Sequence, residues 1–188
     1  FIVPDYWQDK ISTLVSAKSW LKRNYPENTI PMAVVQGKNE IEARECYRIL
    51  RYQGYEKIAF SYGADWYAEE FPHPNPLVGK MMGRILTISK MYKSSIIGKS
   101  DRVHLLGCAL PQEFGYYADF PFIESIDTSN PIIHGLQGVK YNSLGLLSKS
   151  STKIDQIEEE ITTERLYDIN HNLSRFKHFV QDSNTQLY

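Results

Sequence analysis

The sequence predicts an α/β fold in which parallel strands alternate with helices. Three observations indicate this fold: short continuous apolar runs, longer segments with helical periodicity between them, and Gly, Pro and Asn residues at the junctions. Continuous apolar runs are typical of strands buried on both faces, and crossovers of this length suit parallel pairing. Such alternation gives either an open doubly wound sheet or a (βα) barrel. No G-x-G-x-x-G motif follows the first apolar run, which weakens the dinucleotide-binding form of the open sheet.

The apolar runs predict five strands, at Phe1–Val3, Met32–Val35, Lys57–Tyr62, Val103–Leu106 and Phe122–Ile126. Helical periodicity predicts helices over Gln8–Tyr25, Glu40–Gln53, Leu77–Tyr92 and Thr163–Phe179, an acidic helix over Ile154–Thr163 and a short helix over Pro111–Tyr117. Asn39 is a suitable N-cap for the second helix, and Gly54 is a suitable stop. Five strands are too few to close an eight-stranded barrel. Either the chain supplies only about five strand–helix units of such a barrel and the other strands are absent from it, or the sheet stays open and pairs with something else.

These elements divide the chain into three parts. Residues 1–135 hold the strand–helix units, and residues 136–181 hold a loop region and C-terminal helices that pack on them. Residues 182–188 form a tail that is expected to be disordered. The chain opens in an apolar run at Phe1 rather than at Met, which suggests a fragment, a processed product or a chain whose N-terminal part is missing.

The composition gives little support for nucleic-acid binding by the chain as a whole, because the net charge is only −1. A local basic segment carries four candidate contacts to a nucleic-acid backbone: Lys90, Lys93, Lys99 and Arg102. The alternative for these residues is a solvated helix face. The two cysteines, Cys46 and Cys108, make neither a disulfide framework nor a Cys-rich zinc site. No apolar run reaches transmembrane length, so a cytoplasmic location in a bacterium or a phage-infected cell and no membrane partner are expected.

Candidate functional residues lie where each predicted strand ends. In parallel α/β folds, ligands bind beyond the carboxyl ends of the strands. The residues placed there include two carboxylates, a carboxamide and small residues: Asp5, Gln36, Gly37, Ser61, Gly107 and Asp127. A carboxamide and a carboxylate together can read the donor and acceptor edge of a purine-like base. The sequence offers no evident Ser-His-Asp arrangement and no metal-ligand spacing, so covalent chemistry would fall to a carboxylate.

Four segments resemble motifs of the tRNA-guanine transglycosylase superfamily, in the family's order between Met32 and Gly135. Val34-Val35-Gln36-Gly37 resembles the family's V-Q-G strand end, and Gly54-Tyr55 with the stretch up to Gly63 resembles its glycine-rich base-binding strand. The run from His104 to Phe114 is similar to Y-L-M-G-V-G-x-P-E-D-L. The run from Phe122 to Pro131 is similar to D-M-F-D-C-V-x-P.

The resemblance implies a TIM-type (βα) barrel and a base-exchange mechanism. Asp127 would be the nucleophile that attacks C1′ of a nucleotide, so that guanine leaves and a 7-deazaguanine base enters. Asp5 and Gln36 would hydrogen-bond the edge of the base. The rest of the base-binding set would be Gly37, Ala59, Phe60, Ser61, Leu106 and Gly107. From chemistry alone, Tyr62 or Phe60 is expected to stack on the base.

Departures from the family pattern refine these expectations. The three cysteines and the histidine of the family's zinc site have no counterpart, so no cofactor and no metal are expected. Ile132 and Ile133 stand where the family has arginines, Ile58 and Ala59 replace its paired glycines, and its D-S-G-G-F-Q-like segment is missing. These differences favour the zinc-less branch that modifies DNA in phages and bacterial genomic islands, with DNA preferred over tRNA as substrate.

Two further expectations follow from the missing segment, which carries the family's other catalytic aspartate. The chain is expected to work as a homodimer, with an N-terminal half that it lacks here, or with a partner subunit. The alternative function is a non-catalytic nucleobase- or nucleic-acid-binding protein, such as a partner subunit of a transglycosylase. A chance match by an unrelated barrel enzyme is a third reading.

Overall fold

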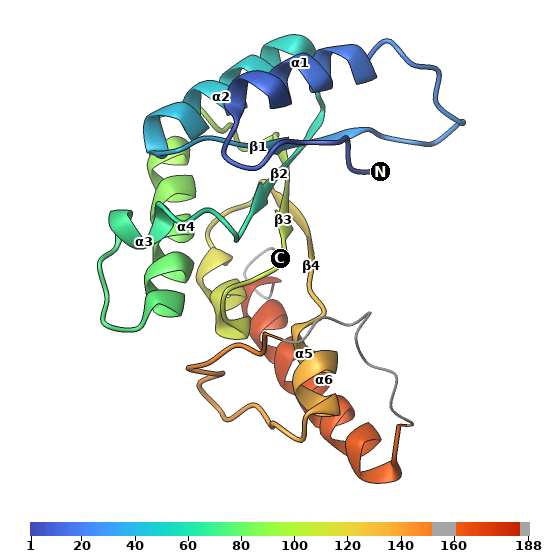
Figure 1. Cartoon of the computed structure of the whole chain (residues 1–188), viewed down its shortest axis with the longest axis vertical. Coiled ribbons are helices and arrows are strands. Elements are labelled where there is room, and N and C mark those ends of the chain that lie inside the picture. Colours follow the sequence, from blue (N-terminus) through green and yellow to red (C-terminus); the bar gives the residue numbers. More distant parts are fainter. Residues whose placement is uncertain (152–160, 185–188) are drawn as a thin grey trace.

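The computed structural model describes residues 1–151 and 161–184 and contains a four-stranded sheet (Figure 1). The strands are β1 (Met32–Val35), β2 (Lys57–Ser61), β3 (Arg102–Leu106) and β4 (Ile123–Asp127). They pair in the order β1-β2-β3-β4, and every pair is parallel. Helices lie between successive strands, so the predicted α/β class with parallel pairing is confirmed.

The predicted strand at Phe1–Val3 is wrong. This segment makes one isolated parallel bridge between Ile2 and Met32 at the edge of β1. The Val3 N–H donates to the Met32 carbonyl at 2.9 Å, and the Met32 N–H donates to the Phe1 carbonyl at 2.8 Å. Pro4 follows at once, and the pairing does not continue beyond this single bridge.

The helices, in chain order, are α1 (Lys10–Trp20), α2 (Glu40–Gln53), α3 (Tyr67–Glu70), α4 (Pro76–Lys93), the 3₁₀ helix η1 (Pro111–Tyr117), α5 (Asn130–Leu136) and α6 (Thr163–Asn184). Both α2 and η1 have their predicted bounds. The Asn39 side chain accepts from the Glu42 N–H, and Gly54 adopts the left-handed conformation that ends the helix. The two short helices α3 and α5 are not predicted by the sequence pattern.

Two predicted helix bounds need correction. Helix α1 is shorter than Gln8–Tyr25, because Gln8 has a positive φ of 54° and Asp9 caps the helix by accepting from the Ser12 N–H. Helix α6 continues to Asn184, so the beginning of the predicted tail is helical. The predicted acidic helix Ile154–Thr163 falls mainly on residues 152–160, which lie outside the described residues, as do tail residues 185–188.

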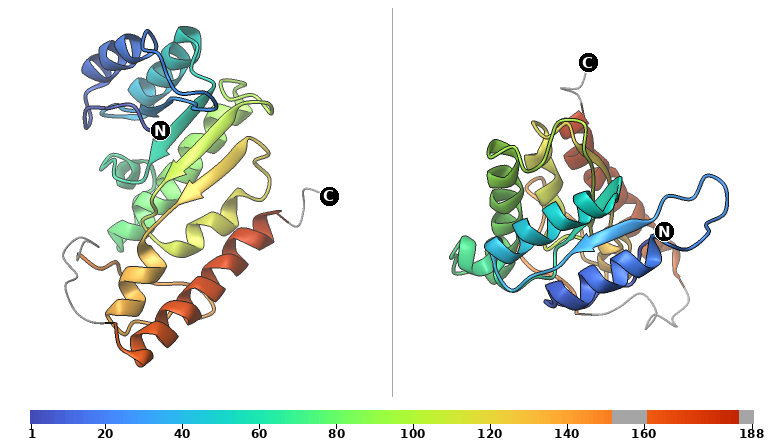
Figure 2. Two further views of the ribbon diagram at one scale, coloured as in Figure 1. Left: turned by 90° about the vertical axis from the view of Figure 1, so that its right-hand side faces the viewer. Right: turned by 90° about the horizontal axis from the view of Figure 1, so that it is seen from above.

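The two faces of the sheet have different surroundings. One face belongs to the main core, in which strand residues such as Phe60 and Leu105 pack with Leu50 of α2 and Ile88 of α4. Figure 2 shows α4 behind the strands in its left-hand view. Met32, Val34 and Ala59 form a second, small cluster with Leu106, and these four residues all come from strands. The helices therefore pack against one face and leave the other to the strand side chains.

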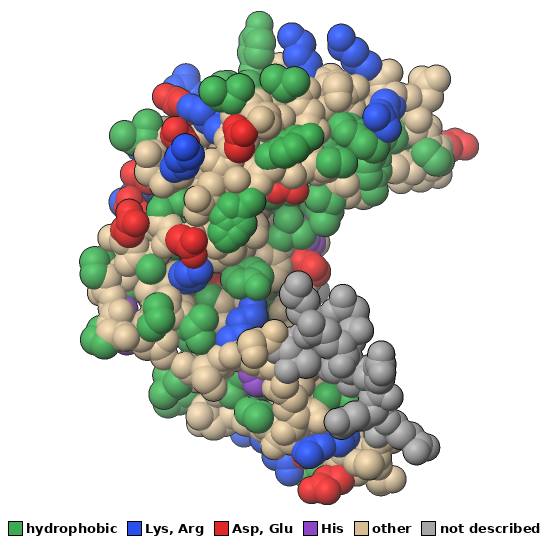
Figure 3. Space-filling model, viewed as in Figure 1, with side chains coloured by type: hydrophobic (Ala, Val, Ile, Leu, Met, Phe, Trp, Pro, Cys, Tyr) green, Lys and Arg blue, Asp and Glu red, His purple; other side chains and the backbone are tan. Residues whose placement is uncertain are grey.

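The C-terminal part of the chain packs beside the end of the sheet. Phe176 of α6 lies edge-on against Phe114 of η1, with ring centroids 5.3 Å apart. The Tyr141 N–H donates to the Asn172 side chain at 2.8 Å, which ties the loop after α5 to α6. Figure 3 shows a molecule hollowed on one side, between the α1–α2 end and the α5–α6 end. Over residues 1–151 and 161–184, no helix combines the length and the apolar character needed to cross a bilayer.

Candidate active site

Two rows of side chains cross the face of the sheet opposite the main core. Ser61 of β2, Leu106 of β3 and Asp127 of β4 are register partners at the carboxyl ends of their strands. Ala59 and His104 form part of the row below them. Register partners point to the same face of a sheet, so these side chains share one surface.

A register shift decides which β4 residues join this surface. The pairing of β3 with β4 shifts between Val103 and His104, so His104 lies opposite Ser125 instead of Glu124. The extra residue of such a bulge turns the following side chains to the other face. Ser125 and Asp127 thereby face the same surface as His104.

Asp127 lies at the centre of the hydrogen bonding on this surface. Its Oδ1 accepts from the Gly107 N–H at 3.0 Å and lies 3.3 Å from Nε2 of His104. Its side chain is 60% exposed although it ends a strand. Both contacts use the same oxygen, and among the described residues no hydrogen bond reaches Oδ2. The carboxylate is thus oriented through one oxygen and open to a ligand through the other.

His104 links Asp127 to Ser125. Its Nδ1 lies 2.8 Å from the Ser125 hydroxyl oxygen. Burial lowers the pKa of His104, and the opposing effect of the Asp127 carboxylate does not cancel this shift. The neutral tautomer that fits both contacts carries its proton on Nε2, donates to Asp127 and accepts from the Ser125 hydroxyl.

This Ser125-His104-Asp127 chain corrects the expectation that no such arrangement exists. The signal in the sequence was the alternation of polar residues at the ends of two strands, but their pairing depends on the bulge. This hydrogen-bonded trio differs from the catalytic triad of a hydrolase. Ser125 lies within a strand, and the residue of the three whose side chain is exposed is Asp127. The group that a ligand can reach is therefore the Asp127 carboxylate, and His104 orients it through Oδ1.

The position that donates to Asp127 requires a glycine, because of its backbone conformation and the close approach of Tyr62. Its φ of +61° is left-handed, and a Cβ there would lie 2.6 Å from Cδ1 of the Tyr62 ring. The Lys149 ammonium lies 3.5 Å from the centroid of the same ring and donates to the Cys108 carbonyl at 2.6 Å. Tyr62 is therefore packed against protein groups on this side, and it also lines a cavity at the carboxyl ends of β1 and β2, so its stacking on a base stays a prediction.

A cavity of about 230 Å³ opens beside this surface, at the carboxyl ends of β1 and β2. The polar and backbone part of its lining comes from Gln36, Gly37 and Ser61, all predicted base contacts. Trp7 and Trp66 are among the aromatic residues that line it. Trp66 is fixed by its indole N–H, which donates to the Gly37 carbonyl at 3.0 Å. Such a combination of flat apolar walls and a few polar groups suits a planar heterocycle.

Asp5 and Gln36 lie together, although 31 positions separate them in the sequence. The Gln36 side-chain amine donates to Asp5 Oδ2 at 2.5 Å, and the Gln8 N–H donates to the Gln36 side-chain oxygen at 2.9 Å. These bonds fix which end of the carboxamide points to which neighbour. One amide hydrogen of Gln36 and the second oxygen of Asp5 are left to bind a ligand.

Ser61, which lines this cavity, lies in the same row of the sheet as Asp127. Ser61 and Asp127 are separated by one strand, so two strand spacings of roughly 4.8 Å place them about 10 Å apart across the sheet. A base lying against Ser61 and Gln36 can therefore carry its sugar towards Asp127.

Two of the predicted base contacts cannot touch a ligand with their side chains. Phe60 is 0% exposed and points into the helix-covered core, where its ring stacks on Tyr47 with centroids 5.7 Å apart. The predicted stacking of Phe60 on a base is therefore wrong, because strand alternation sends its ring to the opposite face from Ser61; the predicted contact through the backbone of Ala59–Ser61 stays a prediction. Ala59 is on the correct face but is also 0% exposed, beneath its neighbours in the small strand cluster. Leu106 is half-buried and lies in the same row as Asp127.

The four predicted backbone contacts do not converge on Asp127. Arg102 begins β3, at the opposite end of the strand, and its guanidinium pairs with Glu124 at 2.7 Å. Lys99 precedes it by three residues. The Lys90 ammonium pairs with Glu70 at 2.6 Å, and Lys93 ends α4. Lys90 and Arg102 are thus engaged with acidic side chains, and the role of the four residues in contacting a nucleic-acid backbone stays a prediction.

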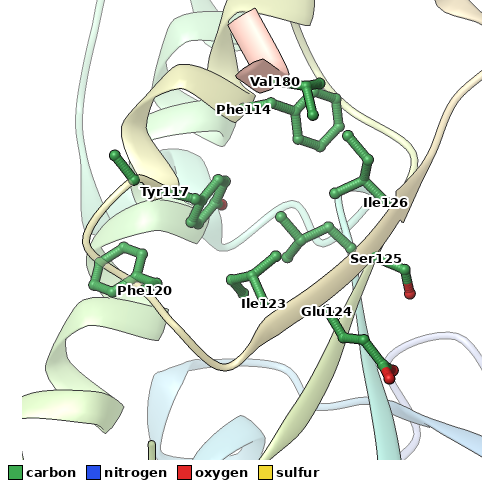
Figure 4. Close-up of a pocket in the computed structure, with 10 residues that line it drawn as sticks. Phe114, Tyr117, Phe120, Ile123, Glu124, Ser125, Ile126 and Val180 are labelled. Atoms are coloured by element: carbon green, nitrogen blue, oxygen red, sulfur yellow. The ribbon is translucent and has the colours of Figure 1, made fainter. Parts of the chain in front are cut away.

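A second pocket lies on the helix side of β4 and has a different character. Figure 4 shows Phe114, Tyr117, Phe120 and Val180 gathered opposite Ile123 and Ile126 of the strand. Its volume is about 70 Å³, much smaller than that of the cavity beside Gln36. The apolar lining and small volume suit a packing defect better than a nucleobase site.

The described residues offer no metal-binding cluster, and comparisons with known proteins give no match. Within residues 1–151 and 161–184, no three His, Cys, Asp or Glu side chains come together as metal ligands. No protein-family model matches the sequence, and comparison with curated proteins finds no significant match. Any functional assignment must therefore rest on the chemistry of the site.

Proposed function

We propose that this chain carries the nucleophile and base pocket of a base-exchange transglycosylase, which replaces guanine in a nucleic acid by a 7-deazaguanine. The observation that carries the proposal is the Asp127 carboxylate, held through Oδ1 by Gly107 and His104 and open at Oδ2. A carboxylate presented in this way is a competent nucleophile at a glycosidic carbon.

The proposed reaction is a double displacement at C1′ of the nucleotide. Asp127 Oδ2 attacks C1′, the C1′–N9 bond to guanine breaks, and guanine leaves with a proton from the surroundings. N9 of the incoming 7-deazaguanine then attacks C1′, the bond to Asp127 breaks, and the N9 proton returns to the surroundings. No net proton and no oxidant are consumed, so the exchange needs no redox cofactor.

The proposed base site is the cavity beside Gln36. Asp5 and Gln36 would bind the hydrogen-bonding edge of the base, while Gly37 and Ser61 would approach its rim. Trp7, which is 57% exposed, is the aromatic side chain best placed to stack on it. Gly107 and Leu106 would lie between this base and the nucleophile.

We further infer that the four strands are consecutive strands of a (βα) barrel. Their spatial order follows their sequence order without reversal, and one face packs against helices while the other carries the site. A doubly wound sheet would reverse its strand order and place helices on both faces. DNA is preferred over tRNA as substrate because the sequence lacks the zinc-site ligands of the tRNA-type enzymes.

The test is covalent trapping on the full chain, with and without any partner subunit. The protein is incubated with guanine-containing DNA or tRNA and a 7-deazaguanine, and a denaturation-resistant adduct is sought. Wild type is expected to form the adduct and Asp127→Asn to form none. Asp119→Asn is the matched control, because Asp119 is an exposed aspartate outside the site. The nucleic acid that gives the adduct identifies the substrate class.

A non-catalytic role is the other candidate, supported by the lack of a second carboxylate beside Asp127 among the described residues. Asp5 lies at the other end of the proposed site, against Gln36, and among the described residues only His104 lies beside Asp127 as a possible acid or base. Tight binding of guanine or 7-deazaguanine without an adduct, in wild type and in Asp127→Asn alike, would decide for this role.

A further inference from the structure

Arg84 of α4 is a fully buried cation whose hydrogen bonds meet the carboxyl ends of β2 and β3. Its side chain is 0% exposed, and Nε donates to Oε1 of Glu113, also 0% exposed, at 2.6 Å. A buried charge requires a partner of opposite charge, so Glu113 explains how Arg84 is tolerated. It does not explain where the remaining donors of the guanidinium point.

Most of those donors point at backbone carbonyls. Nη1 donates to the carbonyls of Phe60 at 3.1 Å and Leu106 at 3.2 Å, and Nη2 donates to the carbonyl of Gly107 at 2.9 Å. The second carboxylate oxygen of Glu113, Oε2, is buried and has no hydrogen-bond partner among residues 1–151 and 161–184. An arginine retained for its ion pair alone would favour two parallel bonds to the carboxylate. This guanidinium instead directs its charge at the strand ends.

One of these carbonyls belongs to the peptide group that binds Asp127. The Leu106 oxygen and the Gly107 N–H are the two ends of a single peptide, and that N–H donates to Asp127 Oδ1 at 3.0 Å. A cationic donor on the oxygen polarises the peptide and strengthens its N–H as a donor. Arg84 also holds the next carbonyl, that of Gly107, so the left-handed turn is fixed on both sides.

We propose that Arg84 is a positioning residue for Asp127 and acts through the Leu106–Gly107 peptide. It orients and strengthens the N–H that holds Oδ1, and this leaves Oδ2 directed at the sugar. The predicted effect of Arg84 on the rate of adduct formation rests on the proposed function of Asp127. Its predicted effect on the Gly107 amide proton can be measured without a nucleic acid.

The test compares Arg84→Lys with Tyr117→Phe, in the full chain. The first measurement is the Gly107 amide proton shift by NMR, and the second is the single-turnover rate of adduct formation at saturating DNA. Arg84→Lys is expected to move the Gly107 amide upfield and to slow adduct formation about tenfold, with little change in the Kd for DNA. Tyr117→Phe removes only the phenol's 2.9 Å bond to Glu113 and is expected to leave both measurements unchanged.

Each outcome decides the matter. An unmoved Gly107 amide in folded Arg84→Lys overturns the proposal, and so do equal changes in the two variants, which would indicate general loosening of the cluster. If Arg84→Lys does not fold, Glu113→Gln replaces it. That change leaves the guanidinium without a competing anion, so a downfield shift of Gly107 is expected, and any other result overturns the proposal. If the amide responds as expected but wild type forms no adduct, the proposed function fails and the positioning of Asp127 remains.

Discussion

Replacing Gly107 by alanine tests how firmly the backbone donor to Asp127 is held. The new Cβ would lie 2.6 Å from Cδ1 and 2.7 Å from Cε1 of Tyr62, so the ring must move. The left-handed backbone costs alanine about 1 kcal/mol. Displacing the ring adds about 1–2 kcal/mol of overpacking, and losing the Lys149 contact over it adds about 0.5–1 kcal/mol. We expect Gly107→Ala to lower the free energy of unfolding by about 3 kcal/mol.

Gly54→Ala is the matched control for this substitution. Gly54 also has a positive φ, of 106°, but a Cβ there would meet nothing within 4 Å. It therefore measures backbone strain without a clash, at about 1–2 kcal/mol. In urea unfolding, a difference of about 1–2 kcal/mol between the variants moves the midpoint by about 0.5–1 M for an m-value near 2 kcal/mol/M. Coincident midpoints for the two variants would refute the inferred packing of Tyr62 on Gly107.

Three further predictions concern acid stability, thiol reactivity and nucleic-acid contacts. Burial lowers the pKa of His104 in the folded protein, so the unfolded chain binds more protons just below pH 6.5. Stability should fall as pH decreases from 6.5 through that lowered pKa, and His104→Gln should flatten this dependence in urea titrations; an unchanged slope would contradict it. Burial also raises the pKa of the Cys46 and Cys108 thiols to about 11, so neither should react with a disulfide reagent at pH 8 until the protein unfolds, and rapid labelling of the native protein would count against this burial. Lys149→Ala should weaken the binding of single-stranded DNA several-fold in an anisotropy titration, because Lys149, unlike Arg102, lies near Gly107. Arg102→Ala should leave the affinity unchanged, since Arg102 lies at the other end of β3. A larger loss of affinity in Arg102→Ala than in Lys149→Ala would indicate that the DNA binds elsewhere.

Local features of the sequence predict the regular elements well. The four strands are found within a residue or two of their apolar runs, because each run is bounded by turn-forming residues. Helix α2 has its predicted bounds because Asn39 and Gly54 supply both of its ends in the local sequence. The exception is Phe1–Val3, where the apolar run is present but pairing is limited to a single bridge with Met32.

The site is less accessible to such reasoning because it depends on register and on distant partners. Asp5 and Gln36 were expected at one edge and are hydrogen-bonded there. The His104–Ser125 contact requires a bulge that has no signature in the sequence. Arg84 is one of several basic residues on its segment, and such residues are usually solvated. Its burial depends on Glu113, a partner 29 positions away.

The strand order has a consequence for how the chain acquires its structure. Each strand pairs only with its immediate predecessor and successor, and paired residues are a few tens of positions apart. Such a topology needs less long-range loop closure than a sheet whose strands pair across the whole length of the chain. As the chain leaves the ribosome, β1 and β2 can pair before β3 is synthesised, and β3 then adds to an existing edge. Asp127, on the last strand to join, would meet its donors Gly107 and His104 only when this stepwise assembly is complete.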